Sequence, residues 1–443
     1  MRSIFHSVYI FGIVFIAAAC SSSKQLDQLF TRASPYEKYL QRLQKNELDR
    51  TALGADWLKA GKMSLEDSLL IEVPYHETGY FPPEKPKALS LRYPVQEGQQ
   101  IHIALETLAQ PEATIFIDVF SVEKDSSLEL IHSADTLPQL QYEVEESGWH
   151  ALRIQPELLR GGAYKLNINF QPSLAFPVSG IDSKAVGSFF GAPRDGGKRS
   201  HKGIDIFAPK GTPVLAVSDG VVGHRMQSGL GGKVVWLSSL EKRFRLYYAH
   251  LDSQAVKPGQ RVSVGDTLGF VGNTGNARTT PPHLHFSIYK ISRGAVDPYP
   301  FVHALLKEEQ ILAADPSEVG IAVRTSATLS NIRKGPTTDS EVIGRFPQYT
   351  WLNIEGKSNR WYRVALPDEQ KGFIHDSLIE PLDEPTQQLE LSEQDKFYFD
   401  NPYGSGAVRG DWIAGNTEVL ANYDSLLFVR TSEGHHGWID TEK

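Results

Sequence analysis

The run from His283 to Ile288 constrains what this chain can fold into more than any other stretch. Its residues alternate between polar and apolar, the pattern of a β-strand with one face in a core and the other on a cleft. The apolar members are Leu284, Phe286 and Ile288, and the polar members are His283, His285 and Ser287. Two imidazoles therefore project from the same face, with Cα atoms about 7 Å apart. At that spacing, one can bind a metal ion while the other lies beside the water on that ion.

A second run, His201-Lys202-Gly203-Ile204-Asp205, carries two more residues that can bind a metal. Gly203, the isoleucines at 204 and 206, and Pro209 all disfavour a helix here. On a straight strand, His201 and Asp205 would lie about 13 Å apart, which is too far to share one ion. We therefore expect the chain to bend near Gly203, where glycine permits it, so that Asp205 points into a cleft.

These residue types indicate zinc chemistry. Two imidazoles and one carboxylate form a three-ligand set that leaves a fourth position open for water. A further histidine, His250, lies between the two runs in Tyr248-Ala249-His250-Leu251. Two histidines then remain for proton transfer beside the ion. Because zinc lowers the pKa of its bound water toward 7, such a set suits hydrolysis near neutral pH.

The segment from Phe189 to Tyr289 resembles the zinc metallopeptidases of the lysostaphin and LytM type, peptidase family M23. The resemblance rests on the two runs and the Tyr-Ala-His-Leu motif, all present in this order. Flanking motifs add to it: Phe190-Gly191, Ala208-Pro209-Lys210-Gly211-Thr212-Pro213-Val214, Asp219-Gly220-Val221-Val222, Val256-Lys257-Pro258-Gly259-Gln260 and Gly272-Asn273-Thr274-Gly275.

This resemblance implies both roles and a substrate. His201, Asp205 and His285 would bind one Zn²⁺ per catalytic domain, and His250 and His283 would line the active site. One of those two would orient or deprotonate the water, and the other would donate to the oxyanion or the leaving amine. The sequence does not say which does which. The implied substrate is the peptide stems and cross-links of peptidoglycan.

Three other interpretations remain open. Some members of the family have lost zinc ligands and activate cell-wall amidases, so the chain could be a non-catalytic wall-binding regulator, although all five positions hold the expected residue type. A serine hydrolase is a weaker rival, because Ser-x-x-Lys at Ser21–Lys24 and at Ser287–Lys290 lacks its companion motifs. The histidines could also be ordinary residues of a plain β-domain.

The length of 443 residues indicates about three domains. The formal charge of −8 gives no general basic surface, so nucleic acid is not an expected partner. A single cysteine, Cys20, excludes an intrachain disulfide. The composition does not indicate an oligomeric state.

The N-terminus has the pattern of an exported lipoprotein. Residues 1–19 read as a signal peptide, with an apolar run too short to span a bilayer. Ala17-Ala18-Ala19 before Cys20 resembles a lipobox, which predicts lipidation of Cys20 and anchoring to a membrane of the cell envelope, on the periplasmic side of the outer membrane. The alternative is ordinary cleavage without a lipid.

We predict a mainly β, multidomain protein. Residues 20–86 form a tether and helical segment, with Tyr36, Tyr39, Leu40 and Leu43 at helical spacing and a second helix over Met63 to Glu72. Short alternating runs predict an N-terminal β-sandwich accessory domain over residues 87–172. Residues 176–308 form the antiparallel β catalytic domain.

The C-terminal region divides into two similar parts. Residues 318–383 resemble a bacterial SH3 domain through Asn331-Ile332-Arg333-Lys334-Gly335-Pro336, and residues 389–443 resemble a second, divergent one through His436-Gly437-Trp438-Ile439. By analogy, these barrels would bind peptidoglycan. The predicted protein is an exported zinc endopeptidase that remodels the cell wall, with the direct D-Ala to diaminopimelate cross-link as the preferred bond.

Overall fold

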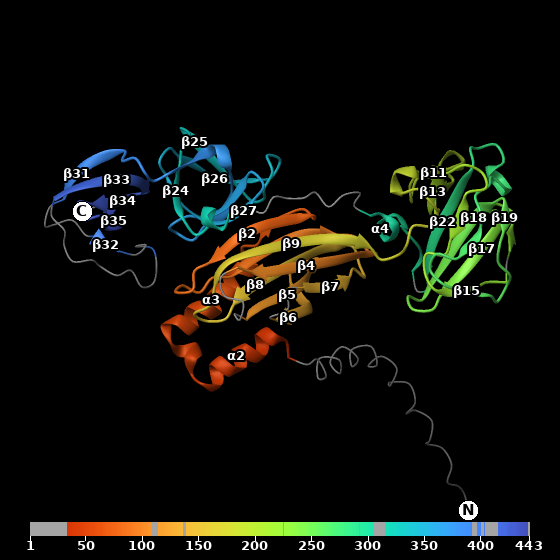
Figure 1. Ribbon diagram of the computed structural model, residues 1–443, viewed down its shortest axis with the longest axis horizontal. Helices are drawn as coiled ribbons and strands as arrows, with labels where there is room; N and C mark the ends of the chain where they lie inside the picture. The colour runs from red at the N-terminus through yellow and green to blue at the C-terminus, as the bar shows by residue number, and fades with distance from the viewer. Residues whose placement is uncertain are drawn as a thin grey trace, which may run out of the picture.

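The computed structural model describes residues 33–108, 114–135, 139–224, 226–291, 293–304, 315–391, 397–399, 403 and 415–441. The expected signal peptide, the lipidation site Cys20 and the start of the tether lie outside these residues, as does part of the second SH3-like segment. About half of the described residues lie in strands and far fewer in helices, which confirms a mainly β, multidomain protein (Figure 1). Within the described ranges, no helix has both the length and the apolar character needed to cross a membrane.

Two helices precede the strands: α2 (Pro35–Lys45) and α3 (Ala52–Glu66). The Ser34 side chain caps α2, and Thr51 caps α3. Tyr36 and Trp57 stack at 4.8 Å between ring centroids and attach the helices to the adjoining sheet. The helix predicted over Met63 to Glu72 is wrong at its end. Helix α3 stops at Glu66, and Leu69–Leu70 form a short strand of the sheet instead.

Residues 69–172 form a β-sandwich whose two sheets share one core. Ile101 and Ile103 lie fully buried in that core, as their alternation with polar residues predicts. One sheet runs in the order β1 (Leu69–Leu70), β3 (Leu89–Val95), β8 (Gly148–Pro156), β5 (Ile115–Val122) and β6 (Leu128–Asp135). The other runs in the order β2 (Tyr75–Phe81), β9 (Gly162–Pro172), β4 (Gln99–Thr107) and β7 (Gln139–Glu143).

Strand β2 lies inside the range predicted to be tether and helix. It carries Glu77 in its centre, so it lacks the apolar run that would have identified a buried strand. The strand is buried because it pairs on one side with β9 and on the other with β27 (Trp351–Ser358), where Thr78 is opposite Lys357. One continuous sheet therefore joins the sandwich to the C-terminal region of the chain (Figure 1).

That region consists of two units. The first SH3-like unit comprises β24 (Ala322–Thr325), β25 (Leu329–Arg333), β26 (Val342–Pro347), β27, β28 (Trp361–Ala365), β29 (Lys371–His375) and β30 (Ile379–Pro381). The second unit comprises β31 (Gln387–Leu391), β32 (Phe397–Tyr398), β33 (Gly415–Tyr423), β34 (Leu426–Thr431) and β35 (His436–Asp440), and its likeness to an SH3 domain stays a prediction. The two units touch, since Trp351 lies 5.3 Å from Trp438 between ring centroids and Arg324 donates to the Leu420 carbonyl.

Residues 176–304 form the middle domain, built on one large and one small antiparallel sheet. The large sheet has the order β10 (Val186–Ser188), β13 (Ile204–Phe207), β22 (His283–Lys290), β18 (Phe244–Leu251), β17 (Gly232–Ser239), β15 (Gly220–Val222) and β20 (Arg261–Val262), with β16 (Gln227–Ser228) on β17 and β23 (Gly294–Val296) on β22. The small sheet has the order β14 (Pro213–Leu215), β21 (Thr267–Phe270) and β19 (Ser253–Gln254). The remaining elements are the pair β11 (Pro193–Arg194) and β12 (Arg199–Ser200), and helix α4 (Tyr299–Val302).

The core of the middle domain lies on one face of the large sheet. Leu284, Phe286 and Ile288 are fully buried there, as the alternation along this strand predicts. Strand β22 lies at the centre of the sheet, between β13 and β18. The opposite face of β22, which carries the histidines, is therefore the face on which a site can form.

Candidate metal centre

The chain bends between β12 and β13, where His201 lies in the connection and Asp205 on the second strand. Gly203 is needed at this bend because the chain passes directly against β22. A Cβ added to Gly203 would lie 2.3 Å from the Phe286 carbonyl oxygen, closer than any side chain can approach. The bend brings His201 back over the strand that carries Asp205.

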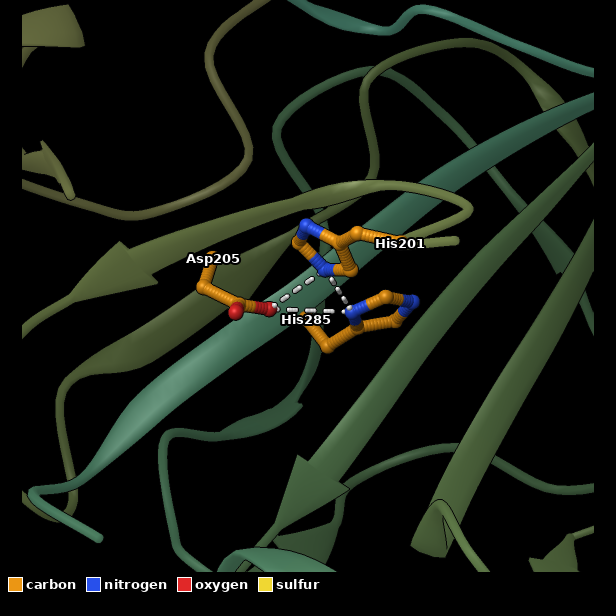
Figure 2. Close-up of side chains that lie close together, drawn as sticks. All are labelled: His201, Asp205 and His285. Carbon is orange, nitrogen blue, oxygen red and sulfur yellow. Dashed lines mark hydrogen bonds and ion pairs between the residues drawn. The ribbon is translucent and has the colours of Figure 1, made fainter. Parts of the chain in front are cut away.

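Strand register brings the third residue to the same place. Asp205 on β13 pairs directly with His285 on β22, and directly opposed residues project from the same face. His201 Nε2 lies 3.0 Å from Asp205 Oδ1 and 3.0 Å from His285 Nδ1, and His285 Nδ1 lies 2.9 Å from Asp205 Oδ1 (Figure 2). Three side chains from two distant parts of the sequence thus point one donor atom each at a common centre.

Hydrogen bonds outside the triangle fix which atoms face inward. His201 Nδ1 lies 2.8 Å from the Phe189 carbonyl oxygen, which can only accept, so a neutral His201 carries its proton there. Its Nε2 lone pair then faces the Asp205 carboxylate at 3.0 Å with no proton between the two acceptors. His285 uses Nε2 for Ser287 Oγ at 2.9 Å, which leaves Nδ1 directed inward. Acceptors this close repel each other unless a cation lies between them, so the donor set fits a bound metal ion.

The second oxygen of Asp205 has a separate partner. Arg194 Nη2 donates to Asp205 Oδ2 at 2.7 Å and to Ser188 Oγ at 2.7 Å. This contact leaves Oδ1 as the inward-facing atom. Burial alone would raise the pKa of Asp205, but positive charge on the rings of His201 and His285, and the hydrogen bonds that the protonated rings donate, outweigh it and hold that pKa well below its usual range. The carboxylate is therefore ionised at neutral pH.

His250 and His283 lie beside the triangle. Their Nδ1 atoms are each 2.8 Å from a carbonyl oxygen, that of Thr274 for His250 and that of Pro281 for His283. Both rings therefore keep Nε2 free, and His283 Nε2 lies 4.0 Å from Asp205 Oδ1. The ring centroid of His250 is 5.0 Å from that of His283 and 5.9 Å from that of His285. The structure thus brings all five residues together at one place.

The backbone at His250 is held in an unusual conformation. Its φ of 62° lies in the left-handed region, which costs free energy for a residue with a side chain. Two hydrogen bonds hold it there: the His250 N–H donates to the Gly231 carbonyl, and the Thr274 N–H donates to the His250 carbonyl. Burial lowers the pKa of His250 to about 4 and also lowers that of His285, so both imidazoles are neutral at pH 7.

Two contributors to the site could not be identified from the sequence. Arg194 and the Phe189 carbonyl reach the site only because β10 and β11 lie over the bend, and no spacing rule predicts this. Ser287 belongs to the predicted polar face of its strand, but its contact with His285 was not anticipated. The hydrogen bonds and ring contacts of the five site residues are all made with residues 188–287, so in the described parts of the chain the N-terminal sandwich supplies none of them.

Comparison with known proteins identifies two segments. Residues 199–298 match the model of peptidase family M23, and residues 326–380 match that of the bacterial SH3 domain. The first match contains all five residues of the site, and the second lies within the first SH3-like unit.

Individual relatives match the same middle segment. An L-Ala–D-Glu endopeptidase of Bacillus subtilis is 35% identical over 141 residues, which cover 29% of this chain and 43% of that protein. The peptidoglycan DD-endopeptidase ShyC of Vibrio cholerae is 38% identical over 116 residues, covering 25% of this chain and 26% of that one. The match therefore spans less than half of either relative. Among solved structures, the catalytic domain of lysostaphin from Staphylococcus simulans is 36% identical, with 26% of this chain and 89% of that chain covered and a TM-score of 0.24.

Proposed function

We propose that this chain, whose residues 199–298 form a domain of peptidase family M23, is a zinc-dependent endopeptidase that hydrolyses peptide cross-links of peptidoglycan. The observation that carries the proposal is the triangle of His201 Nε2, Asp205 Oδ1 and His285 Nδ1, whose sides measure 2.9 to 3.0 Å. Donor atoms bound to one zinc ion at about 2.0–2.2 Å in tetrahedral geometry lie slightly farther apart than this. A small outward relaxation would therefore accommodate the ion.

The proposed ligands are those three atoms, and a hydrogen bond on the far side of each side chain fixes its orientation. The Phe189 carbonyl fixes the His201 ring, Ser287 fixes His285, and Arg194 fixes the second carboxylate oxygen. When bound, zinc would lower the pKa of a water molecule toward 7 and polarise the scissile carbonyl.

His250 and His283 would move the protons. In the neutral form of each ring the proton lies on Nδ1, which is engaged with a carbonyl oxygen, so Nε2 is the atom able to accept a proton. One Nε2 would accept a proton from the attacking water, and the other ring, having taken up a proton from the solvent, would donate to the oxyanion or to the leaving amine. The lowered pKa of His250 suits it to be neutral before reaction, as a base must be.

Two similar proteins guide the choice of substrate. Their names describe cleavage of L-Ala–D-Glu bonds in one case and DD-endopeptidase action on peptidoglycan in the other. For this chain, the proposed bond is the direct D-Ala to diaminopimelate cross-link. Export and a lipid anchor at Cys20 would place the enzyme next to the wall of a cell envelope.

Mass spectrometry of peptidoglycan digested by the full-length chain tests this proposal. The expected result is release of un-cross-linked stem peptides, which stops on chelation and returns when zinc is added. Digestion that persists in the chelator would contradict the zinc assignment. A chain that binds zinc but releases no peptide would contradict the peptidase assignment and support a wall-binding regulator instead.

A further inference from the structure

The face of the large sheet that carries the metal centre continues well beyond it. Register places directly opposed residues on the same side, and Ala249 is opposite His285 while Tyr247 is opposite Ser287. Following these pairs outward from the centre along β22, β18 and β17, the face carries Ser287, Tyr289, Tyr247, Arg245, Trp236 and Ser238. The alternate residues of these strands face the core instead.

Three aromatic rings form a row on this face. The Trp236 ring lies 4.5 Å from that of Tyr247 and 5.4 Å from that of Tyr289, between centroids. Tyr247 in turn lies 6.0 Å from the His285 ring. All three aromatic side chains are only half-buried, so part of each ring remains accessible next to the metal centre. Such rings provide a large apolar surface of fixed shape.

Arg245 lies at the outer end of the row. It is exposed, it is opposite Tyr289, and it makes no ion pair with any residue in the described part of the chain. Four residues along a strand separate Tyr289 from His285, which corresponds to about 13 Å. An extended peptide covers that distance in about four residues.

The charge of the middle domain points to the ligand. Residues 176–304 contain 16 lysines and arginines but only eight aspartates and glutamates, whereas the whole chain has 45 against 53. The middle domain is thus cationic within an anionic protein. A domain with a net positive charge attracts anionic ligands and repels cationic ones.

We propose that this face is a substrate subsite for an anionic peptide: the rings of Trp236, Tyr247 and Tyr289 contact its apolar parts and Arg245 binds a carboxylate about four residues from the reacting bond. The proposal rests on the proposed function, since it assigns the occupant as a stem peptide, whose residues carry free carboxylates. A guanidinium pairs with a carboxylate through two parallel hydrogen bonds, which fixes the register of the peptide as well as its affinity. Arg245 would then help to select which bond reaches the metal centre.

The test uses calorimetric titration of the full-length, zinc-loaded chain with two cross-linked stem-peptide dimers. Both are N-methylated at their backbone amides so that they cannot be cleaved; one has free carboxylates and the other has them amidated. Arg245→Gln should weaken binding of the free-carboxylate peptide about 10-fold and leave binding of the amidated peptide unchanged. Lys257→Gln is the matched control, because it removes the same charge from an exposed position in the turn before β20, the strand at the far edge of the large sheet.

Equal losses for Arg245→Gln and Lys257→Gln would overturn the subsite, since they would show a general charge effect. Amidation that leaves the affinity of the native chain unchanged would also overturn it. Trp236→Leu gives a second measure, with both peptides expected to bind about 10-fold more weakly because ring contacts do not depend on carboxylates. If it has no effect on either peptide, the aromatic row is not part of the subsite.

Cleavage of the unmethylated dimer separates the two proposals. If the chain cleaves the dimer but binds peptides independently of Arg245, the proposed peptidase function stands and the proposed subsite is refuted. If the chain binds peptides through Arg245 but does not cleave the dimer, the subsite stands and the peptidase function is refuted. Absence of both binding and cleavage overturns both.

Discussion

The metal centre and the interface between the sandwich and the first SH3-like unit are both buried clusters of ionisable side chains drawn from distant parts of the sequence. At the interface, Arg363 donates from Nε and Nη2 to the two oxygens of Glu77, each at 3.0 Å, and from Nη1 to Glu355 Oε2 at 2.7 Å. The hydroxyls of Tyr75 and Tyr164 donate to Glu77 as well. We call this group the Arg363 cluster.

The two clusters differ in whether their charges are balanced. In the Arg363 cluster each carboxylate faces cationic or hydroxyl donors, and the positive guanidinium lies between two negative groups. At the metal centre, by contrast, the Asp205 oxygen faces a nitrogen of His201 that carries no proton in the neutral ring. A cluster whose carboxylates all face donors needs no additional group and stabilises the fold. A cluster in which acceptors face each other needs a bound cation between them.

Removal of a proposed metal ligand should have the largest effect. Asp205→Ala should abolish zinc binding and lower kcat/KM by at least about 10³-fold, because the ion loses one of its three protein ligands. Metal content and peptide release measure these effects. Asp252→Ala is the control, since that carboxylate belongs to the same domain but pairs with Lys210 at 3.0 Å. An Asp205→Ala chain that retained full zinc content would contradict the assignment and remove the contrast between the clusters.

Removal of Arg363 should instead affect stability. Arg363→Met leaves the carboxylates of Glu77 and Glu355 buried without their shared cation, which should cost about 3–5 kcal/mol in the free energy of unfolding. Urea denaturation measures this loss. Arg360→Met is the control, because its pair with Asp376 is largely exposed and should contribute little to stability. Equal losses of stability for the two variants would show that the buried cluster contributes no more to the fold than an exposed ion pair.

Acid should weaken the Arg363 cluster in a defined range. Burial alone would raise the pKa of Glu355, but the positive charges of Lys371, Lys87 and Arg363 outweigh it and lower that pKa from 4.5 to about 2. A lowered carboxyl pKa stabilises the fold above pH 4.5, and this contribution of about 3 kcal/mol is lost as the pH falls from 4.5 to about 2. Urea midpoints measured across this range should therefore drop more steeply for the native chain than for Glu355→Gln. Parallel curves would refute the role given to Glu355.

The smallest expected effect concerns the support of a metal ligand. Ser287→Ala removes the partner of His285 Nε2 and should weaken zinc binding about 10-fold, because the ring is then less firmly oriented. Competition with a chromogenic chelator measures the affinity. Ser238→Ala, an exposed serine on the same sheet, should leave that affinity unchanged. An unchanged affinity in both variants would indicate that the strand alone positions His285.

The Arg363 cluster also changes how the two C-terminal units should be studied. Because β27 pairs with β2, deletion of the C-terminal region would expose an edge of the sandwich and leave Glu77 without Arg363. A loss of activity after such a deletion would have two causes that the assay cannot separate: lost wall binding and lost stability of the sandwich. Single substitutions on exposed residues of the first SH3-like unit test wall binding without that complication.

The sequence by itself determined the strand that bears the histidines and the residues around it. Alternation from His283 to Ile288 fixed which side chains enter the core, since apolar burial selects one face of a strand. The need for a bend near Gly203 followed from strand geometry in the same way. These are local consequences of backbone periodicity, so a single sequence contains them.

Only the tertiary structure decided which distant residues meet. The contacts of Arg194 with Asp205, of Arg363 with Glu77 and of β2 with β27 join positions with no periodic relation along the chain. Strand β2 escaped prediction because its polar Glu77 becomes favourable in a buried position only once Arg363 neutralises it. Such compensation depends on where the folded chain places the opposite charge, which composition and local pattern do not specify.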